Sequence, residues 1–292
     1  MSGSSASARC KKARAGVLHR LRLCRDAFFG GLRSAEKRFP GLQHRADSPE
    51  RNRMTKLVDI HCHLVPYVDD GAYDLNEAKA LLREQVRQGV ETICLTPHLR
   101  KGMFETDQSE IDRQVDRLRE LVREAELPLR LYDSREYHFD EGFLRCLAEG
   151  RLKAMGEGKT LLVEFGRRHR AENMFEAIRL CREAGFQPLI AHVERYEPIR
   201  QDSGLAEKLL EQGAKLQVNA GSLLGWEGLR QKWLAHRLVR QGLVAAVASD
   251  AHDLEGRKPN LADCAALLTR KYGQEAAERL LCTGPMALIK DQ

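Results

Sequence analysis

From residue 57 onward, short apolar runs rich in β-branched residues are followed by longer stretches with apolar residues at helical spacing. A short apolar run is typical of a buried strand, and the longer amphipathic stretch is typical of a surface helix. The spacing leaves room for one helix between each strand and the next. The predicted strands are Leu57–Ile60, Thr92–Thr96, Leu129–Asp133, Thr160–Phe165, Pro188–His192, Lys215–Asn219 and Val244–Ser249.

The first two helical stretches have clear core faces. In the first, Asp74 and Glu77 form a capping-box pattern, and Gly89 marks the end of the helix. Its predicted core positions are Ala78, Leu81, Leu82 and Val86. The second stretch, Ser109–Glu126, repeats the pattern, with predicted core positions Ile111, Val115, Leu118 and Val122. The charged residues on the remaining faces are most simply solvated.

Seven such units in succession, with no hairpin signal between them, predict an α/β fold. We expect a distorted (β/α)7 barrel rather than a doubly wound open sheet. The positions of the chemically active side chains support the barrel, because they follow one strand after another. A barrel brings the carboxyl ends of all its strands to one mouth, whereas an open sheet does not.

Nine histidine and acidic side chains stand at or just after the predicted strand ends. Imidazole and carboxylate are the side chains that hold catalytic divalent ions, so this series predicts a metal centre. The predicted ligands are His61, His63, Asp69, His98, Glu136, Glu164, His192, Asp250 and His252.

Two pairs in this series carry the strongest signal. In His61-Cys62-His63 and in Asp250-Ala251-His252, the outer side chains share one side of an extended segment and can bind one ion. Asp69 is the weakest member, because Asp69 and Asp70 together can form an ordinary Asx turn.

Four further histidine and arginine residues have ordinary structural interpretations. Arg135, beside Glu136, is able to form a simple ion pair with a nearby carboxylate. We interpret His19, His44 and His236 as surface or capping residues.

Composition separates an extension from the body. The chain of 292 residues is 42% apolar and 31% charged, a normal globular balance. Residues 1–53 contain thirteen Lys and Arg against four Asp and Glu, which leaves residues 54–292 with a formal charge of −3. The body therefore gives no general electrostatic case for nucleic-acid binding. We expect a disordered basic extension at 1–53, with Met54 as an alternative start, and a catalytic domain at 54–292.

The cysteines and the hydropathy pattern indicate a cytoplasmic protein. The eight cysteines show no C-x-x-C pair and no repeated spacing, as in a reduced chain. No apolar run is long enough to span a bilayer, so we expect no transmembrane segment. A basic amphipathic helix around Val17–Leu23, able to bind an anionic membrane or an acidic partner, remains the alternative for the extension.

Several motifs resemble those of the PHP (polymerase and histidinol phosphatase) superfamily. They are His61-x-His63, Thr96-Pro97-His98, Glu136, Glu164, His192 and Asp250-x-His252. Within that superfamily, five longer motifs resemble the CpsB-like tyrosine phosphatases of bacterial capsule and exopolysaccharide systems. They are Val68-Asp69-Asp70-Gly71-Ala72, Lys101-Gly102-Met103-Phe104, His192-Val193-Glu194-Arg195-Tyr196, Asn219-Ala220-Gly221-Ser222-Leu223-Leu224-Gly225 and Ser249-Asp250-Ala251-His252. The resemblance covers residues 57 to 288 and is specific jointly rather than motif by motif. Val193 and the pair Ser134-Arg135 depart from the family pattern beside the site.

The resemblance implies up to three divalent ions, typically manganese, that hydrolyse phosphotyrosine on a cognate polysaccharide-export tyrosine kinase. The metals are expected to activate a bridging water for in-line attack on phosphorus. Arg195 and Arg257 match family arginines that bind phosphate, and we expect both to clamp it and to act in catalysis. Lys101 is a further candidate for substrate binding. The oligomeric state is left open.

Four other functions compete with this hypothesis. Cys94 and Arg100 satisfy the C-x5-R spacing of cysteine-dependent tyrosine phosphatases, but the loop between them has Pro97 and no glycine to cradle phosphate. A small-molecule phosphatase acting on something like histidinol phosphate and a phosphodiesterase would use the same metals. The non-enzymatic alternative is a silent metal-binding interaction protein.

Overall fold

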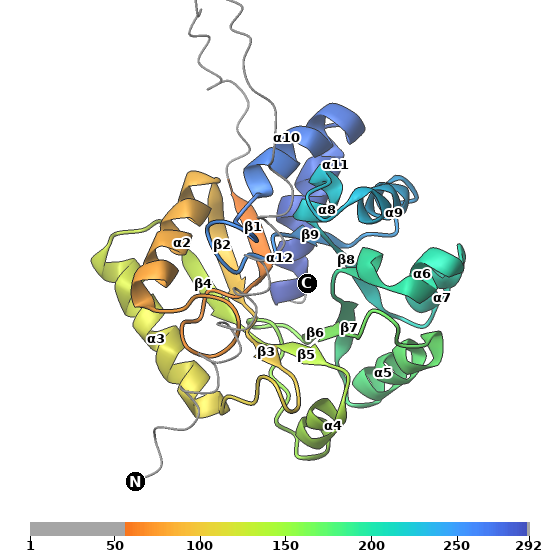
Figure 1. Ribbon diagram of the computed structural model, residues 1–292, viewed down its shortest axis with the longest axis horizontal. Helices are drawn as coiled ribbons and strands as arrows, with labels where there is room; N and C mark the ends of the chain where they lie inside the picture. Colours follow the sequence, from red (N-terminus) through yellow and green to blue (C-terminus); the bar gives the residue numbers. More distant parts are fainter. Residues whose placement is uncertain (1–55, 291–292) are drawn as a thin grey trace, which may run out of the picture. The chain divides into compact units, whose positions relative to one another are not determined.

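The structure, a computed structural model, describes residues 56–290, whose strands and helices succeed one another around a ring (Figure 1). The extension predicted at 1–53 and the start predicted at Met54 lie outside the described residues. The strands are β1 (Leu57–Cys62), β2 (Val90–Leu95), β3 (His98–Leu99), β4 (Arg130–Asp133), β5 (Glu136–His138), β6 (Thr160–Glu164), β7 (Gln187–Ile190), β8 (Lys215–Asn219) and β9 (Ala246–Ala248).

The strands form a seven-membered parallel barrel. Hydrogen bonding follows the orders β1-β2-β4 and β3-β5-β6-β7-β8-β9, with every pair parallel. The ring closes where Cys62 and Ala251 form a parallel bridge and the amide of Asp250 donates to the carbonyl of His61 at 2.8 Å. The predicted distorted (β/α)7 barrel is confirmed.

Two of the seven strand positions are interrupted, which the sequence pattern did not indicate. β3 follows β2 after Thr96 and Pro97, and β5 follows β4 after Ser134 and Arg135. Pro97 has no N–H to give to a ladder, so the strand breaks there. His98 and Glu136 are the first residues after the two breaks, and they pair with each other where β3 meets β5.

Helices follow the strands and, apart from the last helix of the chain, lie around the outside of the barrel (Figure 1). They are α2 (Leu75–Arg87), α3 (Gln108–Glu124), α4 (Glu141–Ala148), α5 (Ala171–Glu183), α6 (Glu197–Gln201), α7 (Leu205–Glu211), α8 (Ala220–Leu224), α9 (Leu229–Arg240), α10 (Leu261–Tyr272), α11 (Gln274–Glu278) and α12 (Gly284–Lys290). A 3₁₀ turn at Val193–Arg195 and a π turn at Arg279–Thr283 complete the elements.

The predicted helix faces hold with one correction. In α3, Ile111, Val115, Leu118 and Val122 are all buried. In α2, the buried residues are Ala78, Leu81, Leu82 and Gln85, while Val86 is only half-buried. Gln85 takes the buried position in place of Val86 because the Gln85 Nε2 donates to buried Asp59 Oδ2 at 2.6 Å.

The start of α2 also differs from the prediction. Asp74 caps the helix as expected, because its side chain accepts from the amides of Asn76 and Glu77. The Glu77 carboxylate accepts from the amide of Tyr73 at 2.6 Å. In a capping box it would accept from the amide of the N-cap residue, Asp74.

The barrel interior is apolar at one end. Val58 and Ile60 of β1 belong to a small core cluster with Leu162 of β6, Leu288 and Ile289. The last two come from α12, which packs against β1 and β9 and fills this end of the barrel. Polar side chains are therefore left to gather at the opposite end, where the strands finish.

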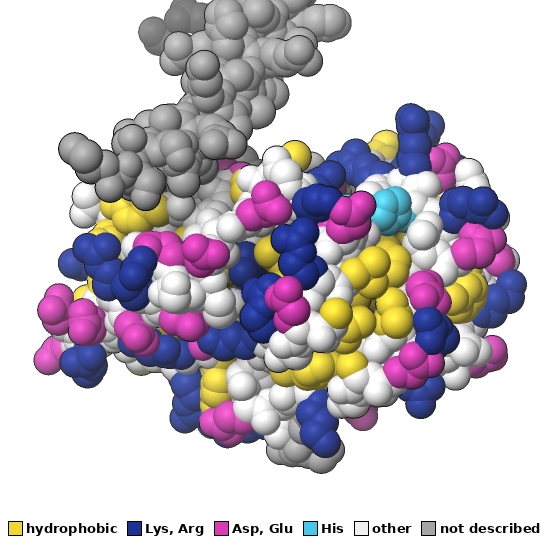
Figure 2. All heavy atoms as spheres, turned by 90° about the horizontal axis from the view of Figure 1, so that it is seen from below, with side chains coloured by type: hydrophobic (Ala, Val, Ile, Leu, Met, Phe, Trp, Pro, Cys, Tyr) yellow, Lys and Arg dark blue, Asp and Glu magenta, His cyan; other side chains and the backbone are white. Residues whose placement is uncertain are grey.

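The surface of the described body is mixed in charge. Figure 2 shows Lys and Arg interspersed with Asp and Glu around a patch of hydrophobic side chains. Such a face lacks the one-signed field that non-specific nucleic-acid binding uses. Within residues 56–290, no helix has both the length and the apolarity that a membrane crossing needs.

Candidate metal centre

The predicted ligands converge at the carboxyl ends of the strands. Three groups of side chains place ligand atoms within 4.8 Å of one another. The groups are His61, His63 and Glu136; His98, Glu136 and Glu164; and His63, Asp70, His98 and His252. Because His63, His98 and Glu136 each belong to two groups, the three groups form one continuous cluster.

Glu136 is the centre of this cluster. Its Oε2 lies 3.2 Å from His61 Nε2, 3.3 Å from His63 Nε2 and 3.0 Å from His98 Nδ1. Its Oε1 accepts from His192 Nε2 at 2.9 Å. The interruption between β4 and β5 places the Glu136 carboxylate where histidines from three other strand ends can reach it.

Asp250 and Glu164 border the cluster on two sides. Asp250 Oδ1 lies 3.5 Å from His61 Nε2 and 3.6 Å from His63 Nε2. Glu164 Oε1 lies 3.5 Å from His98 Nδ1, and its Oε2 lies 3.7 Å from His192 Nε2. The structure thus brings all nine side chains that the sequence predicted as ligands to one place, with Asp69 in contact with the cluster through His63.

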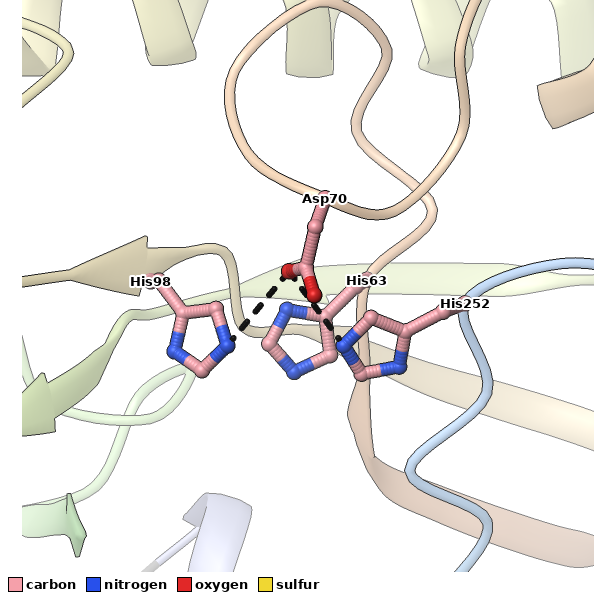
Figure 3. Close-up of side chains that lie close together, drawn as sticks. All are labelled: His63, Asp70, His98 and His252. Atoms are coloured by element: carbon pink, nitrogen blue, oxygen red, sulfur yellow. Dashed lines mark ion pairs between the residues drawn. The ribbon is translucent and has the colours of Figure 1, made fainter. Parts of the chain in front are cut away.

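Asp70, to which the sequence analysis gave no ligand role, stands in one of the three groups, and Asp69 does not. Asp70 Oδ1 lies 3.6 Å from both His98 Nε2 and His252 Nε2, and Figure 3 shows it facing these two rings and His63. Asp69 instead faces the ring edge of His63, whose Nδ1 lies 2.8 Å from Asp69 Oδ2. Asp69 therefore orients a ligand, while Asp70 belongs to a ligand group.

The loop after β1 explains this difference. The amide of Gly71 donates to Asp69 Oδ1 at 3.0 Å, which makes the Asx turn, and the amide of His98 donates to Oδ2 at 3.0 Å. A Cβ at Gly71 would lie 1.9 Å from the carbonyl oxygen of His63, so only glycine allows this close approach. The Asp69 carboxylate therefore forms the turn, and the Asp70 carboxylate faces the mouth of the barrel.

His138 is a site residue that the sequence analysis missed. Its Nδ1 lies 3.1 Å from Glu164 Oε1, so it positions that carboxylate. The signal was present, because Glu136-x-His138 repeats the i, i+2 spacing of the other two pairs on one face of a strand.

Two ligands leave their strands in a left-handed backbone conformation. His192 has φ 32° and Asp250 has φ 53°, a region that residues other than glycine rarely occupy. The amide of His192 donates to Gln217 Oε1 at 2.8 Å, and the amide of Asp250 donates to His61. These bonds hold the strained conformation, which turns both side chains toward the cluster.

A second layer of polar residues fixes the ligands. Gln217 Oε1 also lies 3.1 Å from His61 Nδ1, which leaves Nε2 of that ring for the cluster. Asn219 Nδ2 donates to Asp250 Oδ2 at 2.8 Å, and Tyr196 Oη lies 3.2 Å from His192 Nδ1. Outer bonds of this kind fix which ring nitrogen is free to bind a metal.

The surroundings of three carboxylates, Glu136, Asp250 and Asp69, favour their charged form. Burial opposes the ionisation of Glu136, but the imidazoles of His61 and His98 outweigh it and hold the pKa of its carboxyl well below the usual range. Burial likewise opposes Asp250, yet the Arg195 guanidinium and His61 keep its pKa well below the ordinary value. Asp69 has a pKa lowered to about 2 because His63 outweighs the effect of burial.

The residues fit divalent cations. Glu136 Oε2, His98 Nδ1 and His252 Nε2 are buried and have no hydrogen-bond partner of good geometry, although Glu136 Oε2 lies only 3.0 Å from His98 Nδ1. Such atoms are costly to bury alone, and all three belong to the ligand groups. A bound cation would satisfy them, and a mixture of imidazole and carboxylate ligands suits a transition-metal ion.

The two predicted phosphate-binding arginines lie at the edge of the cluster. Arg195 Nη1 lies 2.9 Å from Asp250 Oδ2 and its Nε donates to Glu227 at 2.7 Å. Arg257 Nη2 donates to Asp70 Oδ2 at 2.7 Å. Each guanidinium is thus held by a carboxylate from the cluster and keeps other N–H groups for a ligand.

Lys101 and Arg135 contact other parts of the molecule. Lys101 Nζ forms an ion pair with Glu141 of α4 rather than with a cluster residue. Buried Arg135 donates to two backbone carbonyls, at 3.1 Å to Thr106 and 2.8 Å to His98, rather than to the carboxylate that the sequence left open as an alternative. It holds the loop that carries Phe104, whose ring stacks on His98 at a centroid distance of 5.2 Å.

The structure argues against the cysteine alternative. Cys94 is fully buried in β2, and burial raises the pKa of its thiol far above the ordinary value. A thiol in that position is neither accessible nor ionised, so it does not act as a nucleophile.

Comparison with known proteins identifies the family. The family model for capsular polysaccharide synthesis, CpsB/CapC, matches residues 57–290. The chain belongs to the CpsB/CapC family. Every residue of the cluster lies within the matched range.

Relatives in the CpsB/CapC family carry the name tyrosine-protein phosphatase. YwqE of Bacillus subtilis is 33% identical over 222 residues, which cover 75% of this chain and 86% of that protein. CpsB of Streptococcus pneumoniae is 32% identical over 241 residues, which cover 81% of this chain and 99% of that protein.

Solved structures give the same relationship. A chain from the crystal structures of YwqE and CpsB, described as unique metal-dependent tyrosine phosphatases, superposes with a TM-score of 0.75 at 31% identity. It covers 81% of this chain and 95% of its own. A phosphotriesterase homology protein from Escherichia coli has a TM-score of 0.52 at 14% identity, covering 80% of this chain and 99% of its own, which shows a shared fold.

Proposed function

We propose that this chain is a metal-dependent protein-tyrosine phosphatase, a phosphoric monoester hydrolase. The observation that carries the proposal is the convergence of three ligand groups on shared His63, His98 and Glu136, with an arginine held beside the cluster on each of Asp70 and Asp250. The family relatives named tyrosine-protein phosphatases support the choice of phosphoester.

We infer up to three divalent ions, one for each ligand group, with manganese as the metal. Each group offers both imidazole and carboxylate atoms, which Mn²⁺ accepts. His61, His63, Asp70, His98, Glu136, Glu164, His192, Asp250 and His252 would hold these ions, with Asp69 and His138 behind them. Bound ions of this kind supply a nucleophilic water at neutral pH and neutralise phosphate charge.

The arginines bind and orient the phosphate in this proposal. Arg195 is held by ion pairs with Glu227 and Asp250. Its remaining N–H groups therefore have a fixed direction and would lose little conformational freedom when a phosphate oxygen accepts from them. Arg257 approaches from the Asp70 side. Both guanidinium groups would donate more strongly as charge grows on the phosphoryl oxygens in the transition state.

An aromatic surface beside the ligands favours an aryl phosphate. The Phe104 ring is parallel to the His98 ring to within 8°, and exposed Tyr67 and Met103 lie in the loops that carry Asp70 and Phe104. A tyrosine ring is able to pack against such side chains. The flexible chain of a small alkyl phosphate would gain less binding free energy from the same contact.

The protein substrate that we propose is a polysaccharide-export tyrosine kinase, met in the cytoplasm. The family's role in capsular polysaccharide synthesis supports that partner. The six described cysteines are all free, as expected in a reducing compartment.

The deciding experiment compares rates on a phosphotyrosine peptide, histidinol phosphate and a phosphodiester, each with manganese and with a chelator. We expect the peptide to be cleaved fastest, the rate to vanish with the chelator, and Cys94→Ser to retain activity. Faster cleavage of histidinol phosphate or of the diester would replace the proposed substrate. Manganese binding without turnover of any of the three would establish a silent metal-binding protein.

A further inference from the structure

Both tryptophans of the chain are exposed on neighbouring segments. Trp226 lies between α8 and α9 and is 49% exposed, and Trp233 of α9 is 61% exposed. Leu229, at the start of α9, is 83% exposed. We call these three residues the tryptophan surface. Large apolar side chains grouped in this way are uncommon on a surface that binds nothing.

The tryptophan surface is not the core face of α9. That helix already buries Leu234, Ala235, Leu238 and Val239 against the barrel. Leu229 and Trp233 are four residues apart and therefore share a different face, which is turned to solvent.

The surroundings of this surface are basic. α9 contains Arg230, Lys232, Arg237 and Arg240 and no Asp or Glu. Arg237 lies over the Trp233 ring at 5.2 Å, and Lys258 lies over the Trp226 ring at 5.3 Å. An apolar surface framed by cations is complementary to a chain that has both acidic and apolar residues.

The tryptophan surface is continuous with the phosphate-binding side of the cluster. Glu227 follows Trp226 directly and accepts from Arg195 at 2.7 Å. Lys258, which contacts Trp226, follows Arg257, and Arg257 pairs with Asp70. A peptide whose phosphotyrosine lies between the two arginines would therefore have its next residues close to Trp226.

We propose that the tryptophan surface docks the acidic segment that flanks the target phosphotyrosine of the protein substrate. This inference rests on the proposed phosphatase function, and it adds a binding surface outside the cluster. Tryptophan beside arginine is the combination that most often dominates binding energy at protein interfaces. An anionic membrane is less well matched, because three exposed side chains on a helix whose other face is buried offer little apolar area for insertion.

The first test uses tryptophan fluorescence, since both tryptophans report on this surface. The full chain with manganese is titrated with a non-hydrolysable phosphonate analogue of an acidic phosphotyrosine peptide. A saturable change in emission is expected, weaker by about tenfold in affinity for a peptide with its acids replaced by Gln and Asn. An emission change with vesicles of anionic phosphatidylglycerol, and none with the peptide, would overturn the proposal in favour of a membrane.

The second test separates docking from chemistry. In the Leu229→Ala/Trp233→Ala variant, KM for the acidic peptide should rise about tenfold, while kcat and the constants for p-nitrophenyl phosphate change less than twofold. Charge reversal by Arg230→Glu with Arg240→Glu should have the same effect. Leu144→Ala on α4 and Arg113→Glu on α3 are matched controls, since both residues are exposed on other helices.

Three results are distinguishable. If the wild type cleaves p-nitrophenyl phosphate and the α9 variants lose equal activity on both substrates, the result contradicts docking and leaves the phosphatase function intact. Unchanged KM for the peptide does the same. Wild type that cleaves no phosphotyrosine contradicts the proposed function itself, and the fluorescence titration then decides whether the surface binds acidic peptides.

Discussion

At the scale of single residues, the position of each carboxylate in the loop after β1 determines which groups it contacts. Asp69 forms hydrogen bonds with three groups of the protein, His63 Nδ1 and the amides of Gly71 and His98. Asp70 faces two ring nitrogens and Arg257. Two adjacent residues of the same type thus act on the cluster in different ways.

We predict that Asp70→Asn and Asp69→Asn differ in metal stoichiometry. Asp70→Asn should bind one fewer manganese per chain, because it removes a charged atom from a ligand group. Asp69→Asn should keep the number and lose about 10–100-fold in affinity or activity, the usual effect of altering a residue behind a ligand. Elemental analysis after equilibrium dialysis measures both. Loss of an ion in Asp69→Asn alone would reverse the assignment.

We predict that Arg195→Lys lowers kcat/KM for a phosphotyrosine peptide about 100-fold. A lysine cannot contact Glu227 and Asp250 at once and still donate two parallel bonds to phosphate. Steady-state kinetics tests this, with Arg179→Lys on the exposed face of α5 as the control. A loss below threefold would show that Arg195 only supports the fold.

At the scale of elements, α9 and α10 are joined by a buried histidine that the sequence suggested was on the surface. His236 Nδ1 accepts from the Tyr272 hydroxyl at 2.7 Å. Burial, together with Lys271 and other nearby cations, lowers the pKa of His236 to about 4. The helix pair therefore requires a neutral imidazole.

This requirement predicts an acid-sensitive contact between the two helices. The unfolded chain binds a proton at His236 near pH 6.5, and the folded chain only near pH 4, so stability falls as the pH drops through that window.

Urea unfolding of the metal-free protein at pH 7 and at pH 4.5 measures this effect. His236→Gln should be less stable than wild type at pH 7, with a difference that shrinks as the pH falls. Tyr272→Phe keeps the titrating group and should keep the pH dependence. A constant difference between wild type and His236→Gln would exclude the histidine as the cause.

At the scale of the whole molecule, the cluster concentrates charge at one end of the barrel. Buried Glu136 and Asp250 are ionised there, and His61 and Arg195 balance them in the absence of metal. Bound cations would balance the negative charge of these carboxylates. Their coordination bonds would also link several strand ends to one another.

We therefore predict that manganese raises the unfolding temperature. At a concentration 100 times Kd, one ion adds about 2.7 kcal/mol to the free energy of unfolding. For a barrel of this size that corresponds to a rise of roughly 5–10 °C. Thermal unfolding followed by circular dichroism measures it, and Glu136→Gln should abolish most of the rise. An equal rise in the variant would place the stabilising ion elsewhere.

We also predict that the chain shortened to residues 54–292 folds and keeps full activity. The ring of strands, its covering helices and the family match all begin at or after residue 56. Kinetics and unfolding temperature of the shortened chain should agree with those of the full chain. A tenfold loss of activity would assign the extension a part in catalysis.

The sequence alone determined the elements and the chemistry. Apolar periodicity gave the seven βα units and both core faces, because burial depends on local spacing that can be read along the chain. The series of candidate ligands followed from its position after strands, since parallel strands in a barrel bring their carboxyl ends together. The family motifs lie on those same ends.

Only the tertiary structure decided which groups each of these side chains contacts. The contacts of Asp70 with His98 and His252, of Gln85 with Asp59 and of His236 with Tyr272 all join groups distant in sequence. The left-handed conformations of His192 and Asp250 likewise accompany hydrogen bonds from their amides to Gln217 and His61 on other strands. Local spacing identifies which side chains are able to bind, but their direction is set by the partners that folding brings to them.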